Sequence, residues 1–177
     1  MTKCVTDYLM QEHQELSLLL NDLQQQLGVL GLARDRGQTV ERLAGLRRKI
    51  IQSIQFHVQE EEQVLYPALQ IHVKGIGITL DRMRLEHNAG ELAGKTFNDS
   101  LDRLLQGKGN PRDVMQTGRL YIVWLRNHLM IENGRLFPMV ERGLDATTQQ
   151  DVRRSMEELT LESTARIAEG QTSVAQA

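Results

Sequence analysis

FHVQEEEQVLYPAL, at residues 56–69, decides the fold, because NHLMIENGRLFPMV at residues 127–140 repeats its pattern. Each stretch has a histidine, a glutamate four residues later, and then a leucine, an aromatic residue and a proline at offsets of eight, nine and ten. Five matches over eleven positions indicate an internal duplication. A Glu-His pair also precedes each stretch, at residues 12–13 and 86–87. We therefore expect the chain to be a duplicated helical hairpin.

Four long helices are predicted from the spacing of the apolar residues. Leucine, isoleucine and valine recur every three or four residues along each segment, which places an apolar stripe on one face. The predicted helices span residues 3–30, 38–66 and 79–106, and a fourth runs from Pro111 through Glu132. Short connections rich in glycine and proline join antiparallel neighbours. The sequence therefore indicates an all-α, up-down-up-down four-helix bundle.

The last part of the chain is more polar than the four helices. A fifth, shorter helix is expected over about residues 146–168, and the tail GQTSVAQA at 170–177 is expected to be disordered. A chain of 177 residues has room for one domain with a substantial core. We therefore predict a single domain over residues 1–169, followed by a disordered tail.

Composition and charge exclude several classes of function. Lys and Arg total 21 against 23 Asp and Glu, so no surplus of positive charge is available to bind nucleic acid. Runs of apolar residues are too short to span a membrane. The single cysteine, Cys4, cannot form an intrachain disulfide, and the first residues lack the apolar run of a signal peptide. We expect a cytoplasmic protein that binds neither nucleic acid nor membranes.

Each long helix carries one histidine on its apolar stripe, and a glutamate follows three of these histidines four residues later. Side chains four residues apart lie on one face of a helix, so both members of such a pair reach the same point. Seven polar side chains are therefore expected to meet inside the bundle. They are His13, His57, Glu61, His87, Glu91, His128 and Glu132.

A metal site explains why seven polar groups share an apolar interior. A single core histidine is satisfied by a hydrogen bond to a neighbour, but seven groups without a metal would leave buried charges and lone pairs unsatisfied. One four-coordinate zinc ion would have too many ligands, whereas two ions of higher coordination that share carboxylates would use them all. Mixed imidazole and carboxylate ligands suit iron, with manganese or zinc as substitutes. The sequence therefore predicts two iron ions with a bridging oxo or hydroxo group and an open coordination position.

These residues resemble the hemerythrin-like, or HHE cation-binding, proteins over about residues 5–160. That family has a lone histidine on the first helix, HxxxE on the second, a histidine on the third and HxxxE on the fourth. The matching residues are His13, His57 with Glu61, His87, and His128 with Glu132. The resemblance implies a non-haem di-iron centre in a four-helix bundle. It also implies that both glutamates bridge the irons, that His13 and His57 hold one iron, and that His87 and His128 hold the other.

Glu91 marks a departure from the oxygen-carrying members of that family, which have HxxxH on the third helix. HxxxE on the second, third and fourth helices resembles a bacterial branch, some members of which are linked to peroxide breakdown or to nitric-oxide responses. A carboxylate beside one iron would stabilise the ferric state, because the low dielectric of the core screens its charge only weakly. Oxygen storage is accordingly disfavoured.

Several functions stay open on the sequence alone. The first is the binding or sensing of oxygen or nitric oxide at the metal centre, in a response to oxidative or nitrosative stress. The second is a catalase-like or peroxidase enzyme that acts on peroxide with the same residues. Iron-sulfur cluster repair and iron storage or donation are further alternatives, although Cys4 alone gives little support for repair. A purely structural bundle that holds zinc or no metal and associates as a homodimer also remains.

The residues beside the proposed ligands receive ordinary interpretations. Glu60 and Glu62 flank Glu61 and are expected to face solvent. Tyr121 and Trp124, seven and four residues before His128, are expected to pack in the core, and the alternative is that they shape the surroundings of the ligands or act as redox-active aromatics. A tyrosine hydroxyl near the metals would nonetheless be able to donate a hydrogen bond to a bound peroxide.

Overall fold

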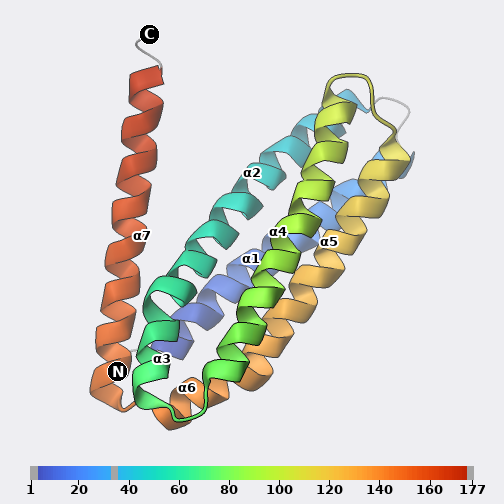
Figure 1. Ribbon diagram of the computed structural model, residues 1–177. Coiled ribbons are helices and arrows are strands. Elements are labelled where there is room, and N and C mark those ends of the chain that lie inside the picture. The colour runs from blue at the N-terminus through green and yellow to red at the C-terminus, as the bar shows by residue number, and fades with distance from the viewer. Residues whose placement is uncertain (1–3, 33–35, 175–177) are drawn as a thin grey trace.

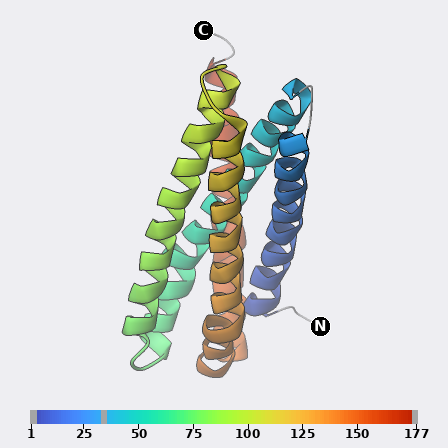
Figure 2. The same ribbon diagram turned by 90° about the vertical axis from the view of Figure 1, so that its right-hand side faces the viewer.

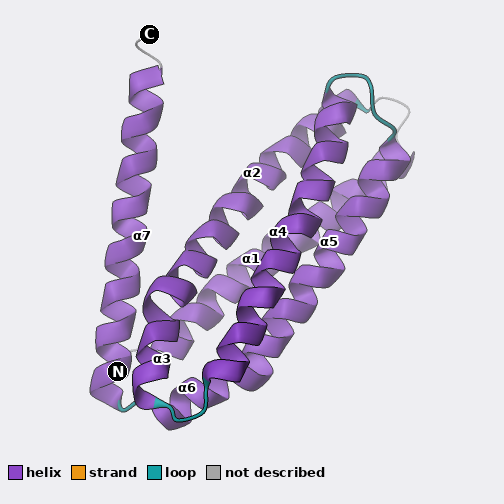
Figure 3. Ribbon diagram, in the orientation of Figure 1, coloured by secondary structure: helices purple, strands orange, loops and turns teal. Residues whose placement is uncertain are grey.

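Helices make up nearly all of the computed structural model, which describes residues 4–32 and 36–174 (Figure 1). The four long helices are α1 (Val5–Leu32), α2 (Gly37–Glu60), α4 (Gly77–Leu105) and α5 (Pro111–Ile131). Each packs beside two others, because α1 contacts α2 and α5, and α4 contacts the same two helices (Figures 1 and 2). Over these residues there is no strand (Figure 3). The predicted all-α four-helix bundle is confirmed.

Two apolar clusters fill the bundle, and α1 shows how they are divided. Leu9 belongs to one cluster and Leu16 to the other, and His13 lies between them on the same buried face. The first cluster also contains Leu65 from the first repeat and Leu136 from the second. Burial of these side chains stabilises both ends of the bundle and leaves a polar layer in between.

The helices of both repeats continue past their prolines, whereas the sequence predicted that the second helix ends at residue 66. A π-helical turn precedes each proline, η1 (Glu61–Leu65) before α3 (Tyr66–His72) and η2 (Glu132–Leu136) before α6 (Phe137–Gly143). In each turn the N–H of the aromatic residue bonds to the glutamate carbonyl five residues earlier. Proline then falls in the first turn of the next helical segment, where its missing N–H costs little.

The C-terminal helix α7 (Ala146–Val174) is longer than the sequence predicted. It has 29 residues, the same as α4, so the expectation of a shorter helix is wrong. Residues 170–174 of the expected disordered tail are helical, and residues 175–177 lie outside the described chain. The first half of α7 packs on α1, α2 and η1, where Val152 and Met156 join the apolar cluster around Leu9. In Figure 1 the second half stands apart from the bundle.

Glu60 joins α7 to the bundle and contradicts the expectation that it faces solvent. Its side chain is fully buried and accepts hydrogen bonds from the hydroxyls of Tyr8 on α1 and Thr160 on α7. Burial raises the pKa of Glu60 to about 7. Glu60, which directly precedes Glu61 in the chain, therefore links α7 to α1 and α2 through its carboxyl group.

None of the helices that the structure describes combines the length and the hydropathy needed to span a bilayer.

Candidate metal centre

Six of the seven predicted ligands meet in the polar layer between the two apolar clusters. Their side chains are buried, and the most exposed of them, His87, has a relative exposure of only 7%. They come from α1, α2, η1, α4, α5 and η2, so every long helix and both π-helical turns contribute one side chain. The six residues are His13, His57, Glu61, His87, His128 and Glu132.

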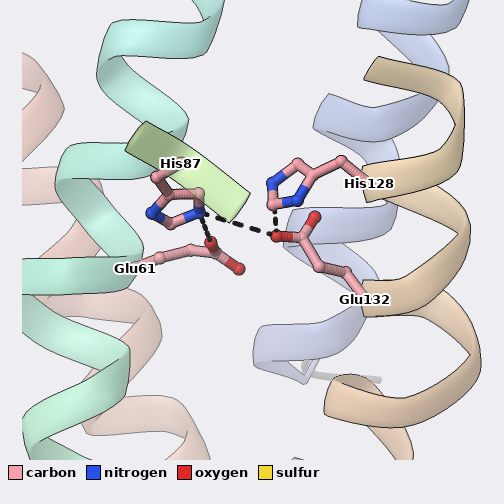
Figure 4. Close-up of side chains that lie close together, drawn as sticks. All are labelled: Glu61, His87, His128 and Glu132. Atoms are coloured by element: carbon pink, nitrogen blue, oxygen red, sulfur yellow. Dashed lines mark ion pairs between the residues drawn. The ribbon is translucent and has the colours of Figure 1, made fainter. Parts of the chain in front are cut away.

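Glu61, His87, His128 and Glu132 form the first group of candidate ligands (Figure 4). His128 Nε2 lies 2.8 Å from Glu132 Oε1, and His87 Nε2 lies 3.2 Å from Glu61 Oε2. His87 Nε2 is also 3.8 Å from Glu132 Oε1. One ligand atom from each of the four lies within 4.8 Å of the others, which is close enough for them to surround one ion.

His13, His57 and Glu132 form the second group. Their imidazoles converge, because His13 Nε2 and His57 Nε2 are 3.2 Å apart. Glu132 Oε2 lies 3.2 Å from the first of these nitrogens and 3.5 Å from the second. This group therefore offers two imidazole nitrogens and one carboxylate oxygen to a second ion.

The two carboxylates lie between these groups. Glu132 turns Oε1 towards His87 and His128 and Oε2 towards His13 and His57. Glu61 turns Oε2 towards His87, and its Oε1 lies 4.0 Å from His57 Nε2. Each carboxylate thus presents one oxygen to each group, which is the placement that two ions with shared carboxylates require.

Several of these atoms surround a common space, close to one another but without a well-formed hydrogen bond. Glu61 Oε1, both oxygens of Glu132 and Nε2 of His128 are buried and have no hydrogen-bond partner among the residues the structure describes. Buried polar atoms without a partner cost free energy unless something else binds them. A cation placed between these atoms would remove that cost, so the donor set fits a metal.

The charges of the metal-free site show the same demand for cations. Burial would raise the pKa of Glu132, but the imidazoles of His128 and His13 hold it well below its usual value. Burial would lower the pKa of His87, but the Glu132 and Glu61 carboxylates outweigh it and raise the pKa to about 10. The pKa of His57 is likewise raised well above its usual value, against the effect of burial, by the charge of Glu61. The buried carboxylates therefore favour positive charge at this site.

Glu91 is the one predicted ligand that the structure does not bring to the centre, which corrects the expectation of seven inward ligands. Its side chain is exposed on α4. The buried face of α4 passes from His87 to Gly90 and Gly94, at steps of three and four residues. The spacing of four residues after His87 predicted that Glu91 points inside, but the helix leaves it exposed, where it lines a cavity.

Three of the four imidazoles have a hydrogen-bond partner on Nδ1, the nitrogen that faces away from the centre. An acceptor at Nδ1 fixes the tautomer and aims Nε2 at the metal. The pairs are His13 with Asn133 (2.9 Å), His57 with Glu12 (3.0 Å) and His87 with Glu62 (2.6 Å).

These three outer partners were not predicted from the sequence, and Glu62 was expected to face solvent. A signal was present, because Glu62 and Asn133 occupy the same position of the repeat, one residue after Glu61 and Glu132 respectively. The π-helical turns begin at these glutamates and change the direction of the side chains that follow. Glu12 directly precedes His13, yet it bonds to the histidine of the neighbouring helix.

A cavity of about 720 Å³ between α2, α4 and α5 leads to the centre. It reaches three of the four imidazoles, those of His57, His87 and His128. The buried Tyr121, the half-buried Trp124 and the exposed Glu91 are among the residues that line it. A small molecule can therefore approach the metal-binding atoms from this side of the bundle.

Comparison with known families supports the same type of site. The sequence profile of the hemerythrin HHE cation binding domain matches residues 4–140. The match covers all six converging side chains and ends before α7 begins. Comparisons with curated proteins and with solved structures found no match.

Proposed function

The chain belongs to the hemerythrin HHE cation binding domain family, and on that premise we propose that it holds two iron ions and binds a small ligand at them. The ligand class we favour is oxygen or nitric oxide, in a response to oxidative or nitrosative stress. The resemblance found in the sequence is confirmed by the family match, and the buried cluster of histidines and glutamates agrees with a metal site.

The placement of the two carboxylates is the observation that carries this proposal. Two imidazoles lie on each side, and Glu61 and Glu132 present one oxygen to each side. Each ion would then have four protein ligands. Iron in such imidazole and carboxylate sites takes about five or six ligands, so each ion would keep a position for a small exogenous ligand.

Outer carboxylates supply the negative charge that the sequence analysis assigned to Glu91. Two divalent ions bring four positive charges, and Glu61 and Glu132 balance half of them. Glu12 and Glu62 lie behind His57 and His87 and balance the rest through the imidazoles. The charge of the site is thus balanced with Glu91 in solvent. Because Glu12 and Glu62 act through imidazoles and not as ligands, they would stabilise the ferric state less than a carboxylate ligand would, and the case against oxygen binding is weaker.

Anaerobic reconstitution with ferrous iron tests the proposal. We expect the reconstituted protein to change its optical spectrum on addition of oxygen or nitric oxide, because bound iron supplies open positions for such ligands. A protein that retains its iron but shows no spectral response to either gas would contradict the proposed function. Metal-free protein treated in the same way is the control.

Peroxide breakdown is the second candidate, and the position of Tyr66 favours it. The Tyr66 hydroxyl donates a hydrogen bond to Glu61 Oε2 at 2.9 Å and lies 3.5 Å from His87 Nε2. A hydroxyl group that can donate a hydrogen bond is thus present beside the metal-binding atoms. We expect an enzyme of this kind to consume hydrogen peroxide repeatedly and Tyr66→Phe to slow that turnover, whereas a single stoichiometric oxidation would argue for ligand binding alone.

A further inference from the structure

His128 is held in a different way from the other three imidazoles. Its Nδ1 is buried and has no hydrogen-bond partner within residues 4–32 and 36–174. Instead, its ring stacks on the indole of Trp124, with ring centroids 5.0 Å apart and an interplanar angle of 16°. Trp124 precedes His128 by one helical turn on α5, so the two rings lie on the same face of that helix.

Gly90 on α4 keeps the indole of Trp124 in this place. A Cβ atom at position 90 would lie 2.0 Å from Cη2 of Trp124, closer than any real contact. The indole therefore occupies the space that a side chain at position 90 would fill. Its rings are confined between the backbone of α4 and the imidazole of His128.

We infer that Trp124 is a positioning residue, which holds His128 in its metal-binding orientation by stacking and so replaces the hydrogen bond that fixes each other imidazole. This inference rests on the proposed metal centre. Rotation of the His128 ring would move Nε2 away from Glu132 Oε1, from which it is 2.8 Å distant. A flat indole packed against the imidazole face blocks that rotation.

The first half of the chain shows why a substitute is needed. Glu12 fixes His57 there, and the residue four positions before His57 is the small Ser53. Glu86 occupies the position of Glu12 in the second half. Nδ1 of His128, however, has no hydrogen-bond partner among the described residues. The two halves thus use different means to orient equivalent ligands.

Substitution of Trp124 tests the inference through metal binding rather than activity. We expect Trp124→Leu to weaken the binding of one of the two ions by about 10- to 100-fold, as is typical when the outer support of a ligand is lost. Titration of the metal-free protein with cobalt, followed by calorimetry and visible absorption, measures both ions. Trp124→Phe keeps a flat ring and should restore most of the affinity.

Tyr121→Leu is the matched control, because it removes an aromatic ring of the same helix and the same cavity. Tyr121 stacks on Phe97, with centroids 6.0 Å apart, rather than on a ligand. We expect this variant to bind both ions as the parent does. Equal loss of affinity in Tyr121→Leu and Trp124→Leu would overturn the inference, because general loosening of the core would then explain both.

Gly90→Ala tests the same contact from the other side. The added methyl group must displace the indole, so we expect weaker binding of one ion although Trp124 is still present. Gly94→Ala is the control, since its Cβ would lie 3.2 Å from the ring of Tyr121. Trp124 is the only tryptophan, so its fluorescence reports displacement directly.

The outcomes separate this inference from the proposed function. If the parent binds no cobalt or iron, the metal centre itself is contradicted. If the parent and a folded Trp124→Leu bind two ions with equal affinity, the metal centre stands and the positioning role of Trp124 is overturned. If Gly90→Ala shifts the fluorescence of Trp124 but leaves both affinities unchanged, the inference is overturned as well.

Discussion

The two halves of the duplicated chain place the same ligands at the centre but support them differently. Each half supplies two histidines and one glutamate, at matching positions of the repeat. Two of the three outer positions differ in residue type, and at the third a glutamate is present in both halves but, among the described residues, bonds to a ligand imidazole only in the first. The first half has Glu12, Glu62 and Tyr66 where the second has Glu86, Asn133 and Phe137. The repeat therefore fixes the positions of the candidate ligands, whereas the surroundings would set the properties of each ion in the proposed centre.

Glu61 and Glu132 show this difference most clearly. Tyr66 donates a hydrogen bond to Glu61, whereas Phe137 has no hydroxyl and its ring stacks on His13 with centroids 5.1 Å apart. Both carboxylate oxygens of Glu132 therefore have no hydrogen-bond partner among the described residues, and Glu132 belongs to both groups of candidate ligands. Glu61 belongs to one group only. Glu61 and Glu132 are therefore unequal in their contacts.

The largest effect is expected from removal of Glu132. Glu132→Ala takes one ligand from each ion, so we expect the metal content to fall from two ions per chain to less than one. Glu61→Ala should lower the metal content less, because Glu61 lies farther from the imidazoles of the second group. Metal analysis after iron reconstitution measures both. Glu91→Ala is the control and should keep two ions, so a loss of metal in that variant would return Glu91 to the ligand set.

The pH dependence of metal binding should be the next largest effect. The pKa of His87 is raised to about 10 and that of His57 is also raised, so both imidazoles favour the imidazolium form, with a proton on each ring nitrogen, before a metal binds at neutral pH. A metal must displace these protons. Affinity should therefore rise with pH, about tenfold per pH unit for each proton displaced, and fall as the solution is acidified. Zinc titrations from about pH 6 to pH 8 measure this slope, and a flat profile would contradict it.

A smaller effect is expected from exchange of the outer charges. Glu62→Gln keeps an acceptor for His87 but removes its negative charge, so we expect about tenfold weaker binding of the ion on that side. Asn133→Asp adds a charge behind His13 and should strengthen binding on the other side. Together the variants would reverse the difference between the halves. Unchanged affinities in both would show that charge at these positions has no influence.

The smallest effect on metal binding is expected from Tyr66→Phe, which makes the first half resemble the second. The variant should keep two ions, while its free energy of unfolding falls by about 1.5–3 kcal/mol, the usual worth of a hydrogen bond to a charged group. Denaturant unfolding of the metal-loaded protein measures this loss. Tyr121→Phe removes a hydroxyl that touches none of the six ligands and should leave the stability nearly unchanged, so an equal loss in both variants would argue against a special role for Tyr66.

Helical periodicity was enough to predict the bundle and the six side chains that converge at its centre. Buried stripes recur every three to four residues, and His13, His57, His87 and His128 all lie on them. Helical periodicity failed at Glu91. Because buried residues recur at steps of either three or four, the residue buried one turn after His87 can be Gly90 or Glu91. There the buried position is Gly90, where Trp124 fills the space.

Local spacing was not enough to predict the outer partners or the long last helix. Glu62 and Asn133 lie inside π-helical turns, and a wider turn changes which face the next residue occupies. Glu12 reaches a histidine on the neighbouring helix, which depends on how two helices pack rather than on spacing within one. The buried Glu60 depends on Tyr8 and on α7 in the same way.

The number and coupling of the bound irons test most directly whether the two halves share one centre. Iron analysis and electron paramagnetic resonance of the oxidised, reconstituted protein measure both properties. We expect two irons per chain and no signal from isolated ferric iron, because Glu61 and Glu132 each present one oxygen to either side. One iron per chain, or two irons that each give the signal of an isolated ferric ion, would contradict the shared centre.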